Sequence, residues 1–289
     1  MNKIIQLLNE PTAGAHPRQS TIHVSFVLVL LIAAAAIFTN LNGQYLWADE
    51  ADTAVFARNI VRYGFPLAWD GRTFIDSDRG DRINSHLVMV GTPWVPFYVT
   101  AASFALFGES ELTARFPFAL AGLATVALLY VLVLRVTGNR SAALIAAFLL
   151  TMNPQFLLYV RECRHYALNM LMTLVMLAAF LRLPQYPRGV LFVFSTVLLY
   201  HVMPLPACAN LAVLGTLTLV HPGFAPQRRA FWLRLPIVLS LTLPWLLVSW
   251  GEVKKTVTFL PGISEAAARL GQFLIEATVA IPALAWVVL

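Results

Sequence analysis

Charged residues are scarce in this chain. Only 12% of its 289 residues are charged, 59% are hydrophobic, and the mean hydropathy is +0.73. Ordinary soluble domains carry about 25% charged residues. The composition therefore excludes a water-soluble globule and indicates a polytopic membrane protein.

Cysteines and phosphate-binding glycine motifs are also few. The two cysteines, Cys163 and Cys208, lie in different segments and do not form a disulfide framework. The sequence has no internal repeat and no glycine-rich loop of the nucleotide-binding kind. The pI of about 9.6 reflects arginines in predicted cytoplasmic loops that face anionic lipids, so we expect no nucleic-acid partner.

Long apolar runs dominate what is present. The first run is preceded by a polar tail over residues 1–20 and lacks a cleavage site after it, which favours a retained span over a signal peptide. Eight runs are candidate membrane-spanning helices. They cover residues 21–41, 116–134, 141–158, 167–181, 190–203, 205–220, 235–250 and 270–289.

Arginines between these runs predict the orientation of the chain. They fall in alternate loops, on the same side as the N-terminal tail, and the positive-inside rule makes that side cytoplasmic. These residues are Arg135, Arg140, Arg182, Arg188, Arg228, Arg229 and Arg234. The remaining loops then face outward.

One more apolar stretch, residues 92–107, would invert every later loop if it crossed the membrane. We therefore expect it to form a helix lying at the outer interface. The outer loop then covers residues 42–115, longer than any other connection, and loops of that length are usually functional. The predicted fold is an all-α polytopic transmembrane bundle whose long outer loop bears interfacial helices.

An acidic cluster, Asp49-Glu50-Ala51-Asp52, follows directly after the first span. Charge at a bilayer edge is costly unless it is used, so the cluster indicates a catalytic or cation site. Residues 52–63 have helical amphipathic spacing, which places the acids at a helix N-terminus favoured by the helix dipole. A helix cap without catalytic function is the alternative.

A second outward loop carries Arg161, Glu162, Arg164, His165 and Tyr166 within six residues. The planar guanidinium fork suits a phosphate, either on a lipid headgroup or on a lipid-linked donor. Glu162 is suited to orient an arginine or to hold a cation. Binding of ordinary phospholipid headgroups is the alternative.

Several of these stretches together resemble a known family. The pattern Trp-Ala-Asp-Glu at 47–50, then Arg58 and Gly-Phe-Pro at 64–66, looks like the start of the protein O-mannosyltransferase and aminoarabinose transferase superfamily. These are GT-C type membrane glycosyltransferases, similar to glycosyltransferase family 39. Residues 107–117, residues 162–168 and the pair Tyr200-His201 resemble later family stretches in the right order.

The resemblance implies transfer of a sugar, hexosyl or pentosyl, from a polyprenyl-phosphate donor to a lipid, glycan or protein acceptor. Asp49 corresponds to the family's base, with Glu50 as its neighbour. The candidate ligands of the donor phosphate are Arg161, Arg164, Tyr166 and Arg58. Candidates for an orienting or cation-binding role are Glu162, His165 and His201. A Mg²⁺ or Mn²⁺ ion between Asp49, Glu50 and the phosphate suits these oxygen ligands, but nothing in the sequence requires it.

We expect the enzyme in a cytoplasmic (inner) membrane, and the orientation given by the arginine loops places its active site on the outer, periplasmic face. Family members usually continue for several hundred residues more, whereas this chain ends at Leu289 within an apolar run, so we expect either a fragment or a C-terminally shortened member. Two alternatives remain. A transporter or translocase of lipid-linked sugar would place its charges at mid-bilayer, and a non-catalytic membrane scaffold would not need them.

Overall fold

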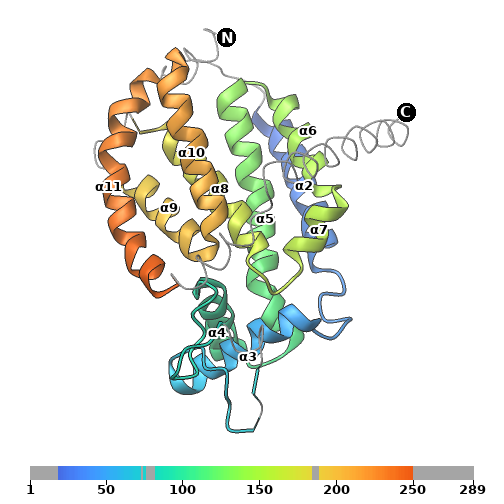
Figure 1. Ribbon diagram of the computed structural model, residues 1–289. Coiled ribbons are helices and arrows are strands. Elements are labelled where there is room, and N and C mark those ends of the chain that lie inside the picture. The colour runs from blue at the N-terminus through green and yellow to red at the C-terminus, as the bar shows by residue number, and fades with distance from the viewer. Residues whose placement is uncertain (1–18, 73, 76–81, 184–188, 250–289) are drawn as a thin grey trace, which may run out of the picture. The chain divides into compact units, whose positions relative to one another are not determined.

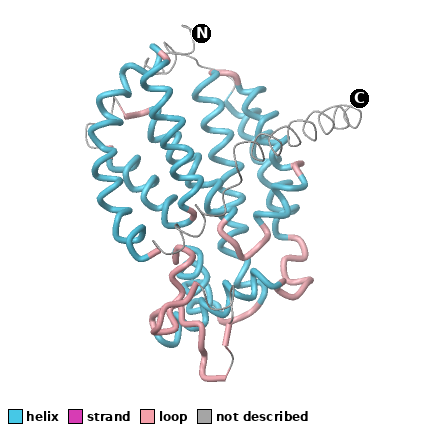
Figure 2. The backbone as a smooth tube through the Cα atoms, in the orientation of Figure 1, coloured by secondary structure: helices cyan, strands magenta, loops and turns pink. Residues whose placement is uncertain are grey.

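A computed structural model describes residues 19–72, 74–75, 82–183 and 189–249. These residues form an all-helical fold, which confirms the predicted fold class (Figures 1 and 2). The only β contacts among the described residues are isolated bridges within the segment 67–89. The helices are α2 (Gln19–Phe38), α3 (Ala48–Tyr63), α4 (Val95–Phe107), α5 (Glu111–Thr137), α6 (Arg140–Thr151), α7 (Pro154–Val160), α8 (Tyr166–Leu181), α9 (Val190–Val202), α10 (Pro204–Val220) and α11 (Ala225–Val248), with the short 3-10 helix η2 (Pro222–Phe224) between the last two.

Helices α3 and α4 lie together at one end of the upright helices, at the bottom of Figure 1. Phe56 of α3 and Phe97 of α4 pack with their ring centroids 5.1 Å apart. Helix α3 ends at Gly64, whose φ of 83° is accessible to glycine without strain. The loops that join these two helices gather at the same end (Figure 2).

Helix α5 is the central element, with contacts to α2, α4, α6, α7 and α8. Its N-terminus is set by Ser110, whose hydroxyl accepts the Thr113 amide hydrogen. Its C-terminus is set by Gly138, with a φ of 65°. These two signals give a helix of 27 residues, long enough to cross a bilayer.

Helices α6 and α7 form a bent pair, at an angle of 66°. The bend occurs at Asn153-Pro154, because proline cannot continue the hydrogen-bond ladder of α6. The Asn153 side chain instead accepts the Phe156 amide hydrogen and starts α7. Helix α7 then leads directly into the second loop, residues 161–165.

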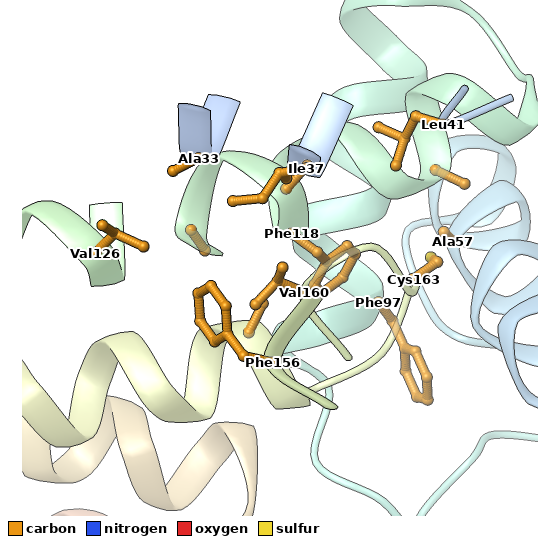
Figure 3. Close-up of a cluster of buried hydrophobic side chains, with 14 of the residues drawn as sticks. Ala33, Ile37, Leu41, Ala57, Phe97, Phe118, Val126, Phe156, Val160 and Cys163 are labelled. Atoms are coloured by element: carbon orange, nitrogen blue, oxygen red, sulfur yellow. The ribbon is translucent and has the colours of Figure 1, made fainter. Parts of the chain in front are cut away.

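Buried side chains form two clusters. The first cluster contains residues from each of the helices α2 through α7 and includes Phe118, Phe156 and Val160 (Figure 3). A β-carbon added to Gly122 of α5 would come within 2.6 Å of the Val160 side chain, so glycine permits this close packing. The second cluster joins α8 to α11 around Phe180, Phe192 and Phe231.

Each of the first seven apolar runs expected to span the membrane contains a helix, and the eighth, 270–289, lies outside the described residues. By length and composition, two described segments qualify as spans, Glu111–Thr137 and Pro222–Val248, and the bent pair α6–α7 gives a third. The other apolar helices are shorter, at 10–17 residues, when α2 is counted from Val24 to Phe38. The stretch 92–107 forms α4, which packs on α3 at the end of the bundle.

Candidate active site

The acidic cluster and the second loop meet in the folded chain. One Asp49 oxygen, Oδ2, lies 3.0 Å from Nη2 of Arg164, and Nη1 of Arg164 donates to the Asp49 carbonyl at 3.4 Å. The Asp49 side chain keeps 44% of its surface exposed and Arg164 keeps 24%. A carboxylate and a guanidinium from distant parts of the sequence thus form one accessible ion pair.

Glu50 has a different environment from its neighbour. Its side chain is 1% exposed and forms a bidentate ion pair with Arg115 of α5, at 2.8 and 2.6 Å. It also accepts the Cys163 amide hydrogen at 2.7 Å. The two acids that are adjacent in the sequence therefore divide into one exposed carboxylate and one buried carboxylate.

Two more acids surround the ion pair. Burial raises the pKa of Glu162, and the Glu50 charge raises it further, while Arg164 opposes both. Burial also raises the pKa of Asp52, reinforced by the neighbouring Asp49. Desolvated carboxylates of this kind, beside a specific charge partner, are typical of functional sites.

Two buried polar atoms at this place have no hydrogen-bond partner, Oε2 of Glu162 and Nε of Arg164. Such atoms are costly in a folded protein because they have lost water without gaining a partner. An acceptor and a donor beside Asp49 are therefore left without hydrogen bonds.

His165 and Tyr166 stand next to each other at the start of α8. Their ring centroids lie 4.3 Å apart, and Tyr166 also packs on Tyr159 at 4.6 Å. Burial lowers the pKa of His165 to about 4, with Arg164 adding to the shift and Asp49 opposing it. The imidazole is consequently neutral near pH 7, where it can donate or accept a hydrogen bond.

Two of the predicted phosphate ligands lie away from the Asp49–Arg164 pair. Nη2 of Arg161 donates to the Thr39 and Asn40 carbonyls at 2.8 and 3.3 Å, at the end of α2. Arg58 forms an ion pair of 3.6 Å with Asp70. It lies nine residues after Asp49 on α3, which is roughly 13 Å along the axis and on the opposite face.

His201, at the end of α9, lines an apolar groove instead. Trp94 and Trp245 also line it, and the two indoles meet edge-on at 5.5 Å. The groove has a volume of about 530 Å³, and its other lining residues are Val95, Tyr98, Val99 and Ala102. This size and lining suit an apolar chain.

Arg115 and the Cys163 amide were missed by sequence reasoning. Arg115 lies inside the stretch 107–117 that carries the family resemblance, but in the sequence it is one of many arginines in a mixed polar loop. Its signal is its place in that motif at the start of an apolar helix, where a buried charge needs a partner.

The described residues contain no group of three His, Cys, Asp or Glu side chains arranged to hold a metal ion. Asp49 and Glu50, the predicted oxygen ligands of a cation, point to different environments. The exposed Asp49 carboxylate remains accessible, whereas both Glu50 oxygens already accept hydrogen bonds.

Comparison with known proteins identifies relatives of this chain. A family model described as dolichyl-phosphate-mannose-protein mannosyltransferase matches residues 91–250. An uncharacterized protein of Aquifex aeolicus (strain VF5) is 26% identical over 137 residues, which are 47% of this chain and 25% of that protein.

Solved structures share the fold. ArnT from Cupriavidus metallidurans bound to undecaprenyl phosphate matches with a TM-score of 0.58 and 23% identity, over 80% of this chain and 42% of that chain. The apo oligosaccharyltransferase of Archaeoglobus fulgidus matches with a TM-score of 0.60 and 14% identity, over 83% of this chain and 33% of that chain. AglB from the same organism, in complex with an inhibitory peptide and a dolichol-phosphate, matches with a TM-score of 0.57 and 14% identity. This match covers 92% of this chain and 37% of that chain. The chain thus spans less than half the length of each of these solved proteins.

Proposed function

The chain belongs to the dolichyl-phosphate-mannose-protein mannosyltransferase family, and we propose that it transfers a sugar from a polyprenyl-phosphate donor to an acceptor hydroxyl. The acceptor is a lipid, glycan or protein at the outer face of a cytoplasmic membrane. The observation that carries this proposal is the ion pair of 3.0 Å between Asp49 and Arg164. It supplies, at one accessible place, the two charges that the reaction needs.

The reaction requires a base and a stabilised leaving group. Asp49 takes the proton of the acceptor hydroxyl while the oxygen of that hydroxyl attacks the anomeric carbon of the sugar. The bond from that carbon to the phosphate oxygen breaks, and the polyprenyl phosphate leaves with the electron pair. A direct displacement of this kind inverts the anomeric carbon and needs no nucleophile on the protein.

Arg164 is the first candidate to hold the donor phosphate. Its partly exposed guanidinium offers donors to a phosphate that would compete with Asp49. That competition would free the Asp49 carboxylate when the donor binds. Tyr166 and His165 border the same place, while Arg161 and Arg58 could reach a phosphate only after leaving their present partners.

A lipid donor also needs a place for its chain. The groove lined by Trp94, His201 and Trp245 is apolar and long-chain lipids favour such surfaces. Two of the solved relatives contain undecaprenyl phosphate or a dolichol-phosphate, which supports a polyprenyl phosphate as the carrier here. We place His201 at the lipid rather than at a cation.

The test measures release of polyprenyl phosphate from a polyprenyl-phosphate-linked mannose by membranes that contain the full chain. Asp49→Asn keeps the size of the side chain but removes the base, so we expect turnover to fall by about 100-fold or more. Glu109→Gln, which alters an exposed acid of the same loop, is the matched control and should keep wild-type turnover.

Turnover by Asp49→Asn within a few-fold of wild type would exclude Asp49 as the base. Movement of intact lipid-linked mannose across the bilayer, without release of polyprenyl phosphate, would instead identify a translocase.

A further inference from the structure

We infer that Glu50 and Arg115 form a positioning strut, a buried ion pair that sets the separation of Asp49 and Arg164 and contacts neither substrate nor metal. The inference rests on the proposed function only in giving Asp49 and Arg164 a catalytic role that depends on the distance between them. The strut itself follows from the hydrogen bonds of its two members.

The Glu50 carboxylate has no acceptor site left. Oε1 accepts from Nε of Arg115 at 2.8 Å and from the Cys163 amide at 2.7 Å. Oε2 accepts from Nη2 of Arg115 at 2.6 Å and from the Trp47 amide at 3.4 Å. A carboxylate offers about four lone-pair sites, and all are used here. Glu50 therefore cannot bind a cation or take a proton without breaking the strut.

The Arg115 guanidinium is equally saturated. Beyond its two bonds to Glu50, Nη1 donates to the Leu41 and Gln44 carbonyls, both at 2.9 Å, and Nη2 donates to the Tyr45 carbonyl at 3.2 Å. A guanidinium has about five N–H donors in a fixed fork, so this set uses all of them. Lysine, with about three donors on one nitrogen, cannot reproduce the arrangement.

These bonds join four segments from three separate regions of the sequence. They are the linker from α2 to α3, the first turn of α3, the start of α5 and the second loop. Glu50 is the direct neighbour of Asp49, and Cys163 is the direct neighbour of Arg164. The strut thus fixes the backbone one residue away from Asp49 and one residue away from Arg164. Its loss would leave the positions of both side chains less restricted.

Cys163 provides a readout of the strut that does not depend on any enzymatic activity. Its side chain is fully buried in the first core cluster (Figure 3), and its sulfur lies 3.4 Å from the Thr100 hydroxyl. Its amide is held by Glu50. If the strut opens, the second loop loosens and the thiol becomes accessible to a maleimide.

The experiment uses the full chain in detergent with Cys208→Ser, which removes the exposed thiol. In this background we expect Arg115→Lys to speed labelling of Cys163 by about tenfold or more at a temperature well below unfolding, because lysine leaves Glu50 and the linker carbonyls short of donors. Arg72→Lys, at an exposed arginine of the outer loop, is the control and should leave the rate unchanged. If Arg115→Lys does not fold, Glu50→Gln is labelled instead, with the same expectation.

Turnover of the polyprenyl-phosphate-linked mannose gives the second arm. Glu50→Gln and Arg115→Lys act on one strut, so the double variant should lose no more than about threefold beyond the worse single variant.

Unchanged labelling of Cys163 in both single variants would overturn the strut, whatever the enzyme does. Faster labelling without any mannose turnover by the wild type would keep the strut and reject mannose as the transferred sugar. Losses of turnover that multiply in the double variant, or a changed requirement for Mn²⁺ in Glu50→Gln, would show a direct catalytic or metal role and overturn the inference.

Discussion

Arg115 binds both oxygens of the Glu50 carboxylate, at 2.8 and 2.6 Å, across 65 positions of sequence. The contact divides an acidic cluster that looks uniform in the sequence. Glu50 is turned inward and occupied, while its neighbour Asp49 faces the accessible guanidinium of Arg164. This division assigns different roles to two adjacent acids and leads to the expectations below.

The two arginines of the second loop should differ in their effect on donor binding. Arg164→Gln removes a partly exposed guanidinium beside Asp49, and we expect the KM for polyprenyl-phosphate-linked mannose to rise by about tenfold or more, the loss typical of a charge-assisted hydrogen bond. Arg161→Gln removes bonds to the Thr39 and Asn40 carbonyls, so KM should rise by less than about threefold. Steady-state kinetics decide, with Arg72→Gln as the exposed control, and equal rises in KM would contradict the ranking.

His165 should make the fold sensitive to acid. Its pKa is lowered to about 4 by burial, so the unfolded chain, with a histidine pKa near 6.5, binds the proton more tightly. The stability that His165 contributes is therefore fully present above pH 6.5 and is lost as the pH falls toward 4. As the pH falls over this interval, the Tm of the wild type should fall relative to the Tm of His165→Gln.

Thermal unfolding in detergent at a series of pH values measures that difference. His86→Gln, at an exposed histidine, is the control and should follow the wild type. A difference between wild type and His165→Gln that does not change from pH 7 to pH 4 would show that His165 is not buried as described.

The α5–α7 contact should depend on glycine at position 122. Alanine normally stabilises a helix interior by about 1 kcal/mol relative to glycine. Here its β-carbon would come within 2.6 Å of Val160, so we expect Gly122→Ala to destabilise the fold by about 1–3 kcal/mol. Val160→Ala should recover much of this loss when the two changes are combined, as measured by unfolding in detergent. Additive losses in the double variant would reject the contact.

The proposed orientation can be tested with two matched serine-to-cysteine changes in the Cys208→Ser background. Ser85 and Ser141 are both exposed, the first in the predicted outer loop and the second at the start of α6. In intact cells a membrane-impermeant maleimide should label Ser85→Cys and not Ser141→Cys, with both labelled after the membrane is opened. The reverse pattern would place Asp49 on the cytoplasmic side.

Part of the candidate site was accessible from residue types and order alone. The acids that follow the first apolar run and the arginines that follow Asn153-Pro154 were predicted to share one face, and Asp49 and Arg164 do form an ion pair. The sequence predicts Arg161 and Arg58 as phosphate ligands, yet the fold gives them other partners. Arg161 binds the carbonyls that follow α2, and Arg58 binds Asp70. Charge identifies a residue that needs a partner, but proximity in space chooses which partner it receives.

The sequence by itself determined that the chain is an all-helical membrane protein, because few charges and long apolar runs leave helices as the structure that satisfies backbone hydrogen bonds in lipid. It also determined where α5 and α7 begin, since capping by Ser110 and Asn153 is local. Only the tertiary structure decided that Glu50 is buried and Asp49 accessible. That outcome depends on Arg115 and Cys163, which lie 65 and 113 positions away and meet Glu50 only when the helices pack.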